Sequence, residues 1–168
     1  MSKRISALTA LLLIFSAFSV CADEAEKQLQ TKYLALFPKP PAGWEAREGA
    51  AQTAQIAMVG GGTQLTREYF RDGEQVTITM IANASMLRTL NVIFNNPAML
   101  AGNPNTQPYS YKDYKGIKKQ VGNGVEISLL VGHNTLVQLK GSNLKEDKVL
   151  EGFLDGMDLK KIEQLIAS

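Results

Sequence analysis

His133 is the only histidine in the chain, and Cys21 is the only cysteine. A serine, threonine or cysteine nucleophile needs a neighbouring base, and a zinc site needs several histidine, cysteine or carboxylate ligands. His133 lies between Gly132 and Asn134, in a segment typical of a turn, so we expect its side chain to be exposed. The sequence therefore favours neither nucleophilic catalysis nor a transition-metal site, and it predicts no cofactor.

Paired carboxylates are the remaining catalytic possibility, because two acids of different pKa can hydrolyse glycosides. Glu45 with Glu48 is one candidate pair, and Glu68 with Glu74 is another. All four lie in polar stretches, and nothing in the sequence indicates the burial that would raise a carboxyl pKa. A carboxylate-based hydrolase is therefore kept as an alternative, while the first expectation is that the protein is not an enzyme.

The most unusual segment combines tyrosines with lysines between positions 109 and 119. Aromatic rings can stack on a ligand or partner while interleaved ammonium groups neutralise its negative charge. The alternative is a solvated hairpin, in which tyrosines cover a sheet edge and lysines discourage strand pairing. The candidate partner or ligand surface consists of Tyr109, Tyr111, Tyr114, Lys112, Lys118 and Lys119.

A second candidate site is an apolar groove lined by Met86, Met99 and Leu100. Methionine adapts to irregular binding surfaces, which favours such a groove. The alternative is that these residues lie on the sheet, because a short helix needs its apolar face buried. A closed apolar cavity would instead make the protein a small-molecule or lipid carrier, which is a second functional alternative.

Residues 1–22 have the pattern of a cleaved secretory signal peptide. Lys3 and Arg4 form its charged region, Leu8–Val20 form its apolar region, and we expect cleavage after Ala22. The protein is then periplasmic, and residues 23–168 form a single domain. Cys21 leaves with the signal, unless it is lipidated instead, so we expect the mature domain to be free of disulfides.

The charge balance argues against a nucleic-acid partner. The chain has 18 basic and 16 acidic side chains, and loss of Lys3 and Arg4 makes these numbers equal. Non-specific nucleic-acid binding needs a surplus of positive charge. Beyond the signal, no apolar run reaches the roughly 18 residues of a membrane-spanning helix. We therefore expect no transmembrane segment in the mature chain, and a partner that is another envelope protein or a small ligand.

Helical periodicity predicts three helical regions. The first is Asp23–Phe37, and the second is Ser85–Phe94 with Ser85 as its N-cap. The third runs from Leu144 to the end, with an interruption near Gly156 and a cap at Asp158.

Alternation of apolar and polar residues predicts a sheet. Leu65–Arg71 and Gln75–Ala82 are expected to form a hairpin around Asp72-Gly73, and part of Ala50–Gly62 is expected to be a strand. Four further strands are Tyr109–Tyr114, Ile117–Val121, Val125–Val131 and Thr135–Lys140, the first two joined at Lys115-Gly116. The predicted class is α+β, a mainly antiparallel sheet of about six or seven strands flanked by N-terminal, central and C-terminal helices.

Two short motifs carry a resemblance to known proteins. Asn96-Pro97-Ala98-Met99 follows the central helix, and the strand Leu136–Gly141 precedes the closing helix. With the order of elements over most of Trp44–Ile166, they resemble the α/β/α sandwich of PsbP-like proteins, the extrinsic photosystem proteins and their relatives, and small uncharacterised exported bacterial proteins. The resemblance implies this fold and a non-catalytic accessory role, and it assigns no functional residue.

Overall fold

A computed structural model describes residues 34–47, 63–100 and 102–166 of the chain. The predicted signal peptide, nearly all of the predicted N-terminal helix and the strand expected within Ala50–Gly62 lie outside these ranges. Of the predicted first helix only Leu34 is described as helical, and a turn follows it. Among the described residues, no helix has both the length and the apolar character needed to cross a bilayer.

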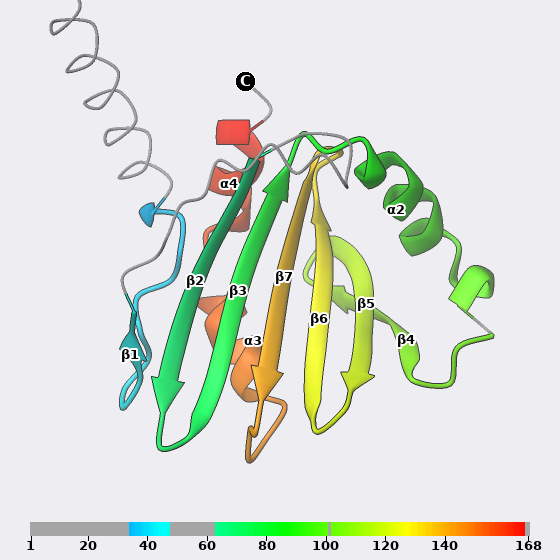
Figure 1. Ribbon diagram of the computed structural model, residues 1–168. Coiled ribbons are helices and arrows are strands. Elements are labelled where there is room, and N and C mark those ends of the chain that lie inside the picture. The colour runs from blue at the N-terminus through cyan, green and yellow to red at the C-terminus, as the bar shows by residue number, and fades with distance from the viewer. Residues whose placement is uncertain (1–33, 48–62, 101, 167–168) are drawn as a thin grey trace, which may run out of the picture. The chain divides into compact units, whose positions relative to one another are not determined.

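The described residues form one seven-stranded antiparallel sheet in the order β1-β2-β3-β7-β6-β5-β4 (Figure 1). The strands are β1 (Glu45–Ala46), β2 (Thr63–Arg71), β3 (Glu74–Ala82), β4 (Thr106–Tyr111), β5 (Tyr114–Val121), β6 (Gly124–Val131) and β7 (Thr135–Ser142). The helices are α2 (Met86–Asn95), α3 (Val149–Asp155) and α4 (Leu159–Ile166), with a 3₁₀ helix, η2, at Pro97–Leu100. The predicted α+β class with an antiparallel sheet is confirmed.

The β2–β3 hairpin turns at Asp72-Gly73, as the sequence predicts. Both residues adopt positive φ, 46° for Asp72 and 82° for Gly73, as two-residue hairpin turns require. The register pairs Arg71 with Glu74 and continues along both strands. Every second residue of β3 is buried, so β3 presents one face to a core.

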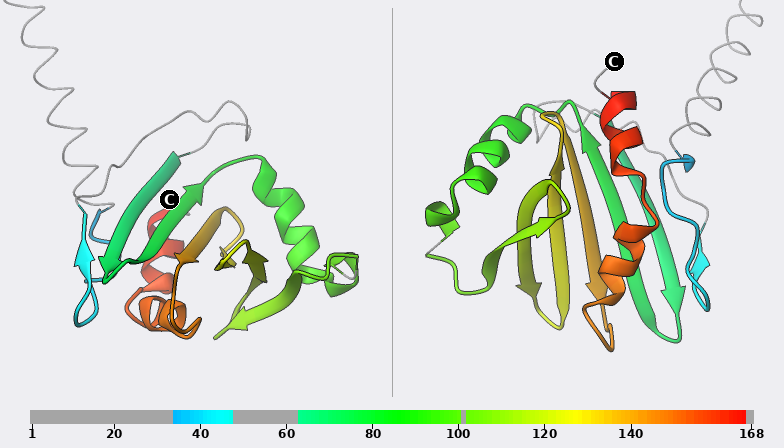
Figure 2. Two further views of the ribbon diagram at one scale, coloured as in Figure 1. Left: turned by 60° about the horizontal axis from the view of Figure 1, so that its bottom comes forward. Right: turned by 180° about the vertical axis from the view of Figure 1, so that it is seen from behind.

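The main core lies between the sheet and helices α3 and α4, on what we call the α3–α4 face (Figure 2). The rings of Tyr69 and Phe153 lie 4.8 Å apart, and Trp44 meets Phe153 edge-on at 5.1 Å. The Tyr69 hydroxyl donates a hydrogen bond of 2.8 Å to the carbonyl oxygen of Pro38. Buried strand residues of this face include Val76, Ile78, Met80, Ile127, Leu129, Val137 and Leu139.

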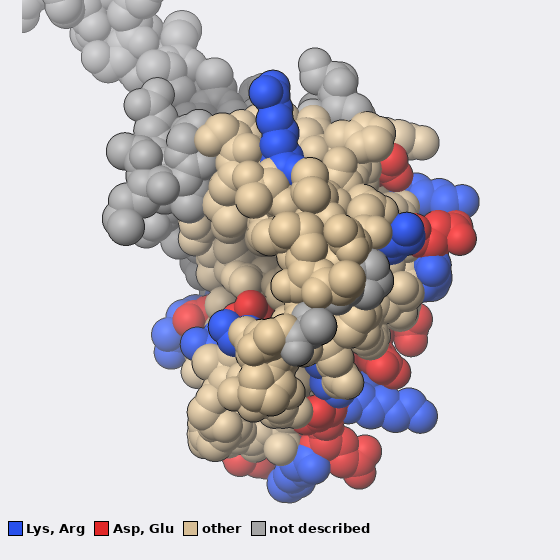
Figure 3. All heavy atoms as spheres, turned by 90° about the vertical axis from the view of Figure 1, so that its right-hand side faces the viewer, with Lys and Arg blue, Asp and Glu red and all other residues tan. Residues whose placement is uncertain are grey.

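Helix α2 lies on the opposite face, which we call the α2 face. Leu87 and Phe94 of the helix are buried with Leu130 of β6 and Leu136 of β7. Leu130 and Leu136 alternate with the buried residues of the α3–α4 face, so the two cores lie on opposite sides of the sheet. Figure 3 views the molecule from the side of α2, where uncharged atoms make up most of the surface that faces the viewer.

The β4–β5 turn differs from the prediction. The chain turns at Lys112-Asp113, where Lys112 has a φ of 54°, and not at Lys115-Gly116. Gly116 lies inside β5 opposite Leu129. The position requires glycine, because an added Cβ would overlap the backbone carbonyl of Ser128. This glycine therefore permits close approach of two strands, which a local turn pattern does not distinguish from a turn.

The C-terminal region is helical over less of its length than predicted. Residues 144–148 are not helical, because the Lys145 amide donates to the Glu74 carboxylate at 2.8 Å, which holds this segment as a connection. The predicted break near Gly156 and the predicted cap at Asp158 are confirmed, since the Lys161 amide donates to Asp158 Oδ1 at 2.9 Å. Ser85 occupies the N-cap position of α2 as predicted, without a side-chain capping bond.

Candidate functional site

Three tyrosines of the β4–β5 hairpin point toward the C-terminal helices. Tyr109 and Tyr111 share one face of β4 because they are two residues apart, and the register places Tyr111 opposite Tyr114 of β5. The Tyr109 hydroxyl donates to Glu151 at 3.3 Å and the Tyr114 hydroxyl to Glu163 at 3.4 Å, while Tyr111 donates to Asp155. Each phenol is thus bonded to a carboxylate of α3 or α4.

Lys118 extends this row of contacts. Its ammonium lies 2.9 Å from the carboxylate of Asp147, just before α3. Asp147, Glu151 and Asp155 recur at four-residue intervals, so their spacing presents acids along one side of this segment. The hairpin is therefore attached to the C-terminal helices by polar contacts, whereas the centre of the sheet is attached by an apolar core.

These surroundings disfavour ionisation of the phenols. Partial burial, with the nearby Glu151 charge, raises the pKa of Tyr109 to about 12. Burial and the bond to Asp155 raise the pKa of Tyr111, and burial and the Glu163 charge raise that of Tyr114. All three tyrosines are therefore neutral hydrogen-bond donors at physiological pH.

The structure divides the six predicted surface residues. Tyr109, Tyr111, Tyr114 and Lys118 face α3 and α4, and their polar groups are bonded within the chain. Lys112 is exposed in the turn with its ammonium 4.9 Å from the centre of the Tyr111 ring, and Lys119 lies on the opposite face beside Glu126. That the six residues contact a partner stays a prediction.

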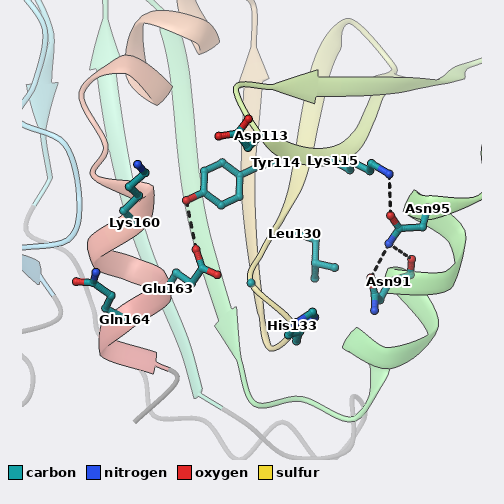
Figure 4. A pocket seen from close by; sticks show the side chains of 11 residues that line it. Asn91, Asn95, Asp113, Tyr114, Lys115, Leu130, His133, Lys160, Glu163 and Gln164 are labelled. Atoms are coloured by element: carbon teal, nitrogen blue, oxygen red, sulfur yellow. Dashed lines mark hydrogen bonds between the residues drawn. The ribbon is translucent and has the colours of Figure 1, made fainter.

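A groove opens beside the tip of this hairpin, with a volume of about 660 Å³. Four chain segments that are distant in sequence supply its walls: the end of α2, the start of β5, the β6–β7 turn and α4 (Figure 4). Apart from Leu130 and Gly132, its lining residues are polar: Asn91, Asn95, Asp113, Tyr114, Lys115, His133, Lys160, Glu163 and Gln164.

The groove lies where β5 separates from β6. The β5–β6 register ends at Gly116 and Leu129, whereas the β6–β7 register continues to Val131 and Thr135. The first residues of β5 stay paired with β4 and move away from β6 with it (Figure 1). The space that this opens is bordered by α2 on one face of the sheet and by α4 on the other.

The α2 wall is a hydrogen-bonded amide network. Asn95 Nδ2 donates to Asn91 Oδ1 at 2.7 Å and to the Asn91 carbonyl oxygen at 2.8 Å. The Lys115 ammonium donates to Asn95 Oδ1 at 3.0 Å. These bonds hold Lys115 beside the groove and orient both amides (Figure 4).

The α4 wall carries charges of both signs. Glu163 accepts from Tyr114, and its stem lies over Gly132, where an added Cβ would come within 3.1 Å of Glu163 Cγ. Gly132 also has a φ of 64°, which favours glycine. Asp113, Tyr114 and Lys160 also line a second recess of about 530 Å³ around the α3–α4 junction, so the two recesses adjoin at the hairpin tip.

His133 is exposed at the mouth of the groove, in the turn where the sequence places it. The nearest arrangement to a catalytic set is His133 with Glu163 and Tyr114 in one groove. Glu163 is bonded to Tyr114, however, and the raised pKa of Tyr114 keeps that phenol protonated. This geometry suits recognition of charged and polar groups better than activation of a nucleophile.

The other predicted sites are not assembled. Met86 begins α2, while Met99 and Leu100 follow its end, so the length of the helix, roughly 15 Å at 1.5 Å per residue, separates them. Glu68 and Glu74 lie on opposite faces of the β2–β3 hairpin, because the strand register places them on alternate positions.

Glu74 has a structural role. It is 2% exposed, its carboxylate lies 2.8 Å from the Arg71 guanidinium, and it accepts from the Lys145 amide. These two partners, the amide first, lower the pKa of Glu74 and keep it ionised. Glu48 is outside the described residues, and within the described part no three histidine, cysteine or acidic residues are placed to hold a metal ion.

Most of the groove residues were not among the sequence candidates. Asn91 and Asn95 recur at a spacing of one helical turn, which is a weak signal for a polar side of α2. Lys160, Glu163 and Gln164 look like the solvated side of an ordinary amphipathic helix. Only the tertiary arrangement shows that the two sets border one space.

The comparisons with protein-family models, with curated protein sequences and with solved structures give no match for this chain. The resemblance to PsbP-like proteins therefore stays a prediction. A fold alone does not define a function, which depends on the residues of the site.

Proposed function

We propose that this chain is an exported, non-catalytic accessory protein of the periplasm that binds a small zwitterionic ligand or the end of a peptide in the groove beside the β4–β5 hairpin. The observation that carries this proposal is the convergence of four distant segments, with charged and amide side chains, around one open space. A concave site with convergent polar groups is the usual form of a ligand site.

The charges of the groove indicate the ligand chemistry. Lys115 and Lys160 offer ammonium groups, and Asp113 and Glu163 offer carboxylates. A ligand with one charge would meet repulsion from half of these groups, whereas a ligand with both charges can pair with each kind. The free ends of amino acids and short peptides have this chemistry.

The alternatives fit the site less well. A carrier of lipids needs a closed apolar cavity, while both recesses are open to solvent and bordered by charged side chains. A hydrolase would use two carboxyls of different pKa across a substrate. Of the two acids that line the groove, Glu163 instead accepts a hydrogen bond from Tyr114, and Asp113 is exposed in the hairpin turn.

Calorimetric titration with diglycine tests the proposal, with N-acetyl-diglycine and diglycinamide as analogues that each lack one charge. We expect diglycine to bind and each analogue to bind about 1.5- to fivefold more weakly, as exposed charge pairs contribute about 0.2–1 kcal/mol. Lys160→Met is expected to weaken diglycine but not diglycinamide, while Lys140→Met, an exposed change outside the groove, leaves both unchanged. No binding, or equal binding of all three compounds, would refute the proposal.

Export is tested separately by cell fractionation and by the mass of the mature protein. We expect a periplasmic protein that begins at Asp23. A membrane-anchored product that begins at a lipid-modified Cys21 would identify lipidation instead. A cytoplasmic product that retains residues 1–22 would contradict this part of the proposal.

A further inference from the structure

Two charged groups of the groove are held by neutral partners. Glu163 accepts a hydrogen bond from the Tyr114 phenol, and the Lys115 ammonium donates to the Asn95 amide (Figure 4). Within the described part of the chain, neither Glu163 nor Lys115 forms an ion pair. An ammonium group adds Coulombic attraction to the hydrogen bond that it donates to a carboxylate, whereas a phenol does not. A ligand ammonium group can therefore replace Tyr114 with a gain in binding.

Glu163 is better placed than Asp113 to select an ammonium group. Asp113 is exposed in the hairpin turn, where water screens its charge, whereas Glu163 is half-buried on α4. Glu163 Oε1 lies against the β6–β7 turn, 3.3 Å from the position that a Cβ of Gly132 would take. Glu163 Oε2 is the oxygen that accepts from Tyr114. An ammonium group that binds this carboxylate from the groove therefore competes with the phenol for Oε2.

The segment that carries Tyr114 is only lightly held. We call residues 110–115 the hairpin tip, because they pair with one another but lie beyond Gly116, where the β5–β6 register ends. None of these six residues is buried. The Tyr114–Glu163 bond has an O···O distance of 3.4 Å, longer than the roughly 2.7–2.8 Å of most hydroxyl bonds. A segment without buried side chains opens at a low cost in free energy, so the hairpin tip can move when the phenol is displaced.

We propose that Glu163 selects the ammonium group of the ligand, and that Tyr114 occupies this carboxylate until the ligand displaces it. This inference rests on the proposed function, because it concerns the same groove. Of the two tyrosine–carboxylate bonds that hold the hairpin tip on the C-terminal helices, displacement removes that of Tyr114 and leaves that of Tyr111 to Asp155. The hairpin tip is then a lid that the ammonium group of the ligand releases.

Two matched tyrosine variants test the competition by calorimetric titration. Tyr114→Phe frees the Glu163 carboxylate, whereas Tyr109→Phe removes the same hydroxyl from Glu151, an acid that lines neither recess. We expect Tyr114→Phe to bind diglycine and diglycinamide about two- to twelvefold more tightly than the wild type, the worth of one hydrogen bond. N-acetyl-diglycine, which lacks the ammonium group, should bind no more tightly, and Tyr109→Phe should bind all three compounds as the wild type does.

Glu163→Gln tests the role of the carboxylate itself. The amide oxygen can still accept from Tyr114, but the negative charge is lost. We expect diglycinamide to bind about 1.5- to fivefold more weakly to this variant, and N-acetyl-diglycine to bind as before. In the double variant Tyr114→Phe with Glu163→Gln, most of the gain from Tyr114→Phe should disappear, because the freed group is no longer charged.

Hydrogen exchange measures the lid directly. In the wild type, saturating diglycinamide should raise the exchange rates of the hairpin-tip amides by about two- to twelvefold, toward those of unliganded Tyr114→Phe. N-acetyl-diglycine should leave these rates unchanged. Exchange in the β2–β3 hairpin, which is part of the main core, serves as the internal control and should not respond to either compound.

The results separate this inference from the proposed function. If the wild type binds diglycine but Tyr114→Phe binds diglycinamide no more tightly, the competition is refuted while the groove remains a ligand site. An equal gain for N-acetyl-diglycine, or an equal gain in Tyr109→Phe, would also overturn it, because the gain would then come from general loosening of the hairpin. If neither the wild type nor Tyr114→Phe binds diglycine, the proposed function fails and the inference fails with it.

Discussion

Replacing Gly116 by alanine is expected to destabilise the protein strongly. An added Cβ would overlap the carbonyl oxygen of Ser128 and would lie 2.9 Å from its carbonyl carbon and 3.0 Å from Leu129 Cα. All three atoms belong to the backbone of β6, which is paired on both sides, so no flexible side chain can yield. Overpacking of a core costs about 1–3 kcal/mol, and rigid backbone neighbours place this case near the upper end.

The matched control is the same substitution at Gly152, in the middle of α3. An added Cβ there meets no atom within 4 Å. Alanine is favoured over glycine in a helix by about 0.8–1 kcal/mol, so Gly152→Ala should be stabilising. The two variants change the chain by the same methyl group, and we expect shifts of opposite sign.

Urea unfolding followed by the fluorescence of Trp44, which lies in the main core, measures both effects. We expect the free energy of unfolding to fall by about 3 kcal/mol for Gly116→Ala, and the melting temperature to fall by roughly 10 °C. A wild-type midpoint for Gly116→Ala would show that β5 and β6 do not approach so closely, and the account of where the groove opens would be wrong.

Three further changes test other contacts. Because burial raises the pKa of Tyr69 and Tyr109 to about 12, above the value near 10 of an unfolded tyrosine, stability should be full below pH 10 and fall as the pH rises toward 12. Phenolate absorbance recorded with circular dichroism should show ionisation and unfolding together, and free ionisation near pH 10 would contradict this. Phe153→Ala removes a fully buried ring between two aromatic neighbours. We expect the free energy of unfolding in urea to fall by about 3–5 kcal/mol, and a fall below about 1 kcal/mol would contradict this packing. Asp158→Ala removes the α4 cap and should lower the stability measured by thermal unfolding by about 1 kcal/mol. Asp158→Asn can still cap the helix and should retain most of that stability.

Features that depend on a few neighbouring residues could be predicted from the sequence. The turn at Asp72-Gly73 follows from residues that tolerate positive φ, and the break at Gly156 with its Asp158 cap follows from helix-end preferences. The same local argument failed at Gly116, because glycine serves both in turns and where two strands approach closely. Only the position of Ser128 shows that Gly116 serves a close approach of two strands and not a turn.

The β4–β5 hairpin shows the same difference between what neighbouring residues predict and what only tertiary contacts decide. Strand alternation is sufficient to place Tyr109 and Tyr111 on one side, and the acids from Asp147 to Asp155 recur at helical spacing. The tyrosines and the acids are about forty positions apart, and no local pattern predicts that they contact each other, since either set could equally face solvent. The separation of Glu68 from Glu74, in contrast, already follows from the hairpin register.

By itself, the sequence determined the α+β class, the β2–β3 hairpin and the apolar faces of the strands, because turn chemistry and side-chain periodicity act over a few residues. Tertiary structure alone decided the groove. Its walls come from α2 and α4, on opposite faces of the sheet, and they border one space only because β5 separates from β6 beyond Gly116. Such a site depends on distances between segments that no local pattern encodes.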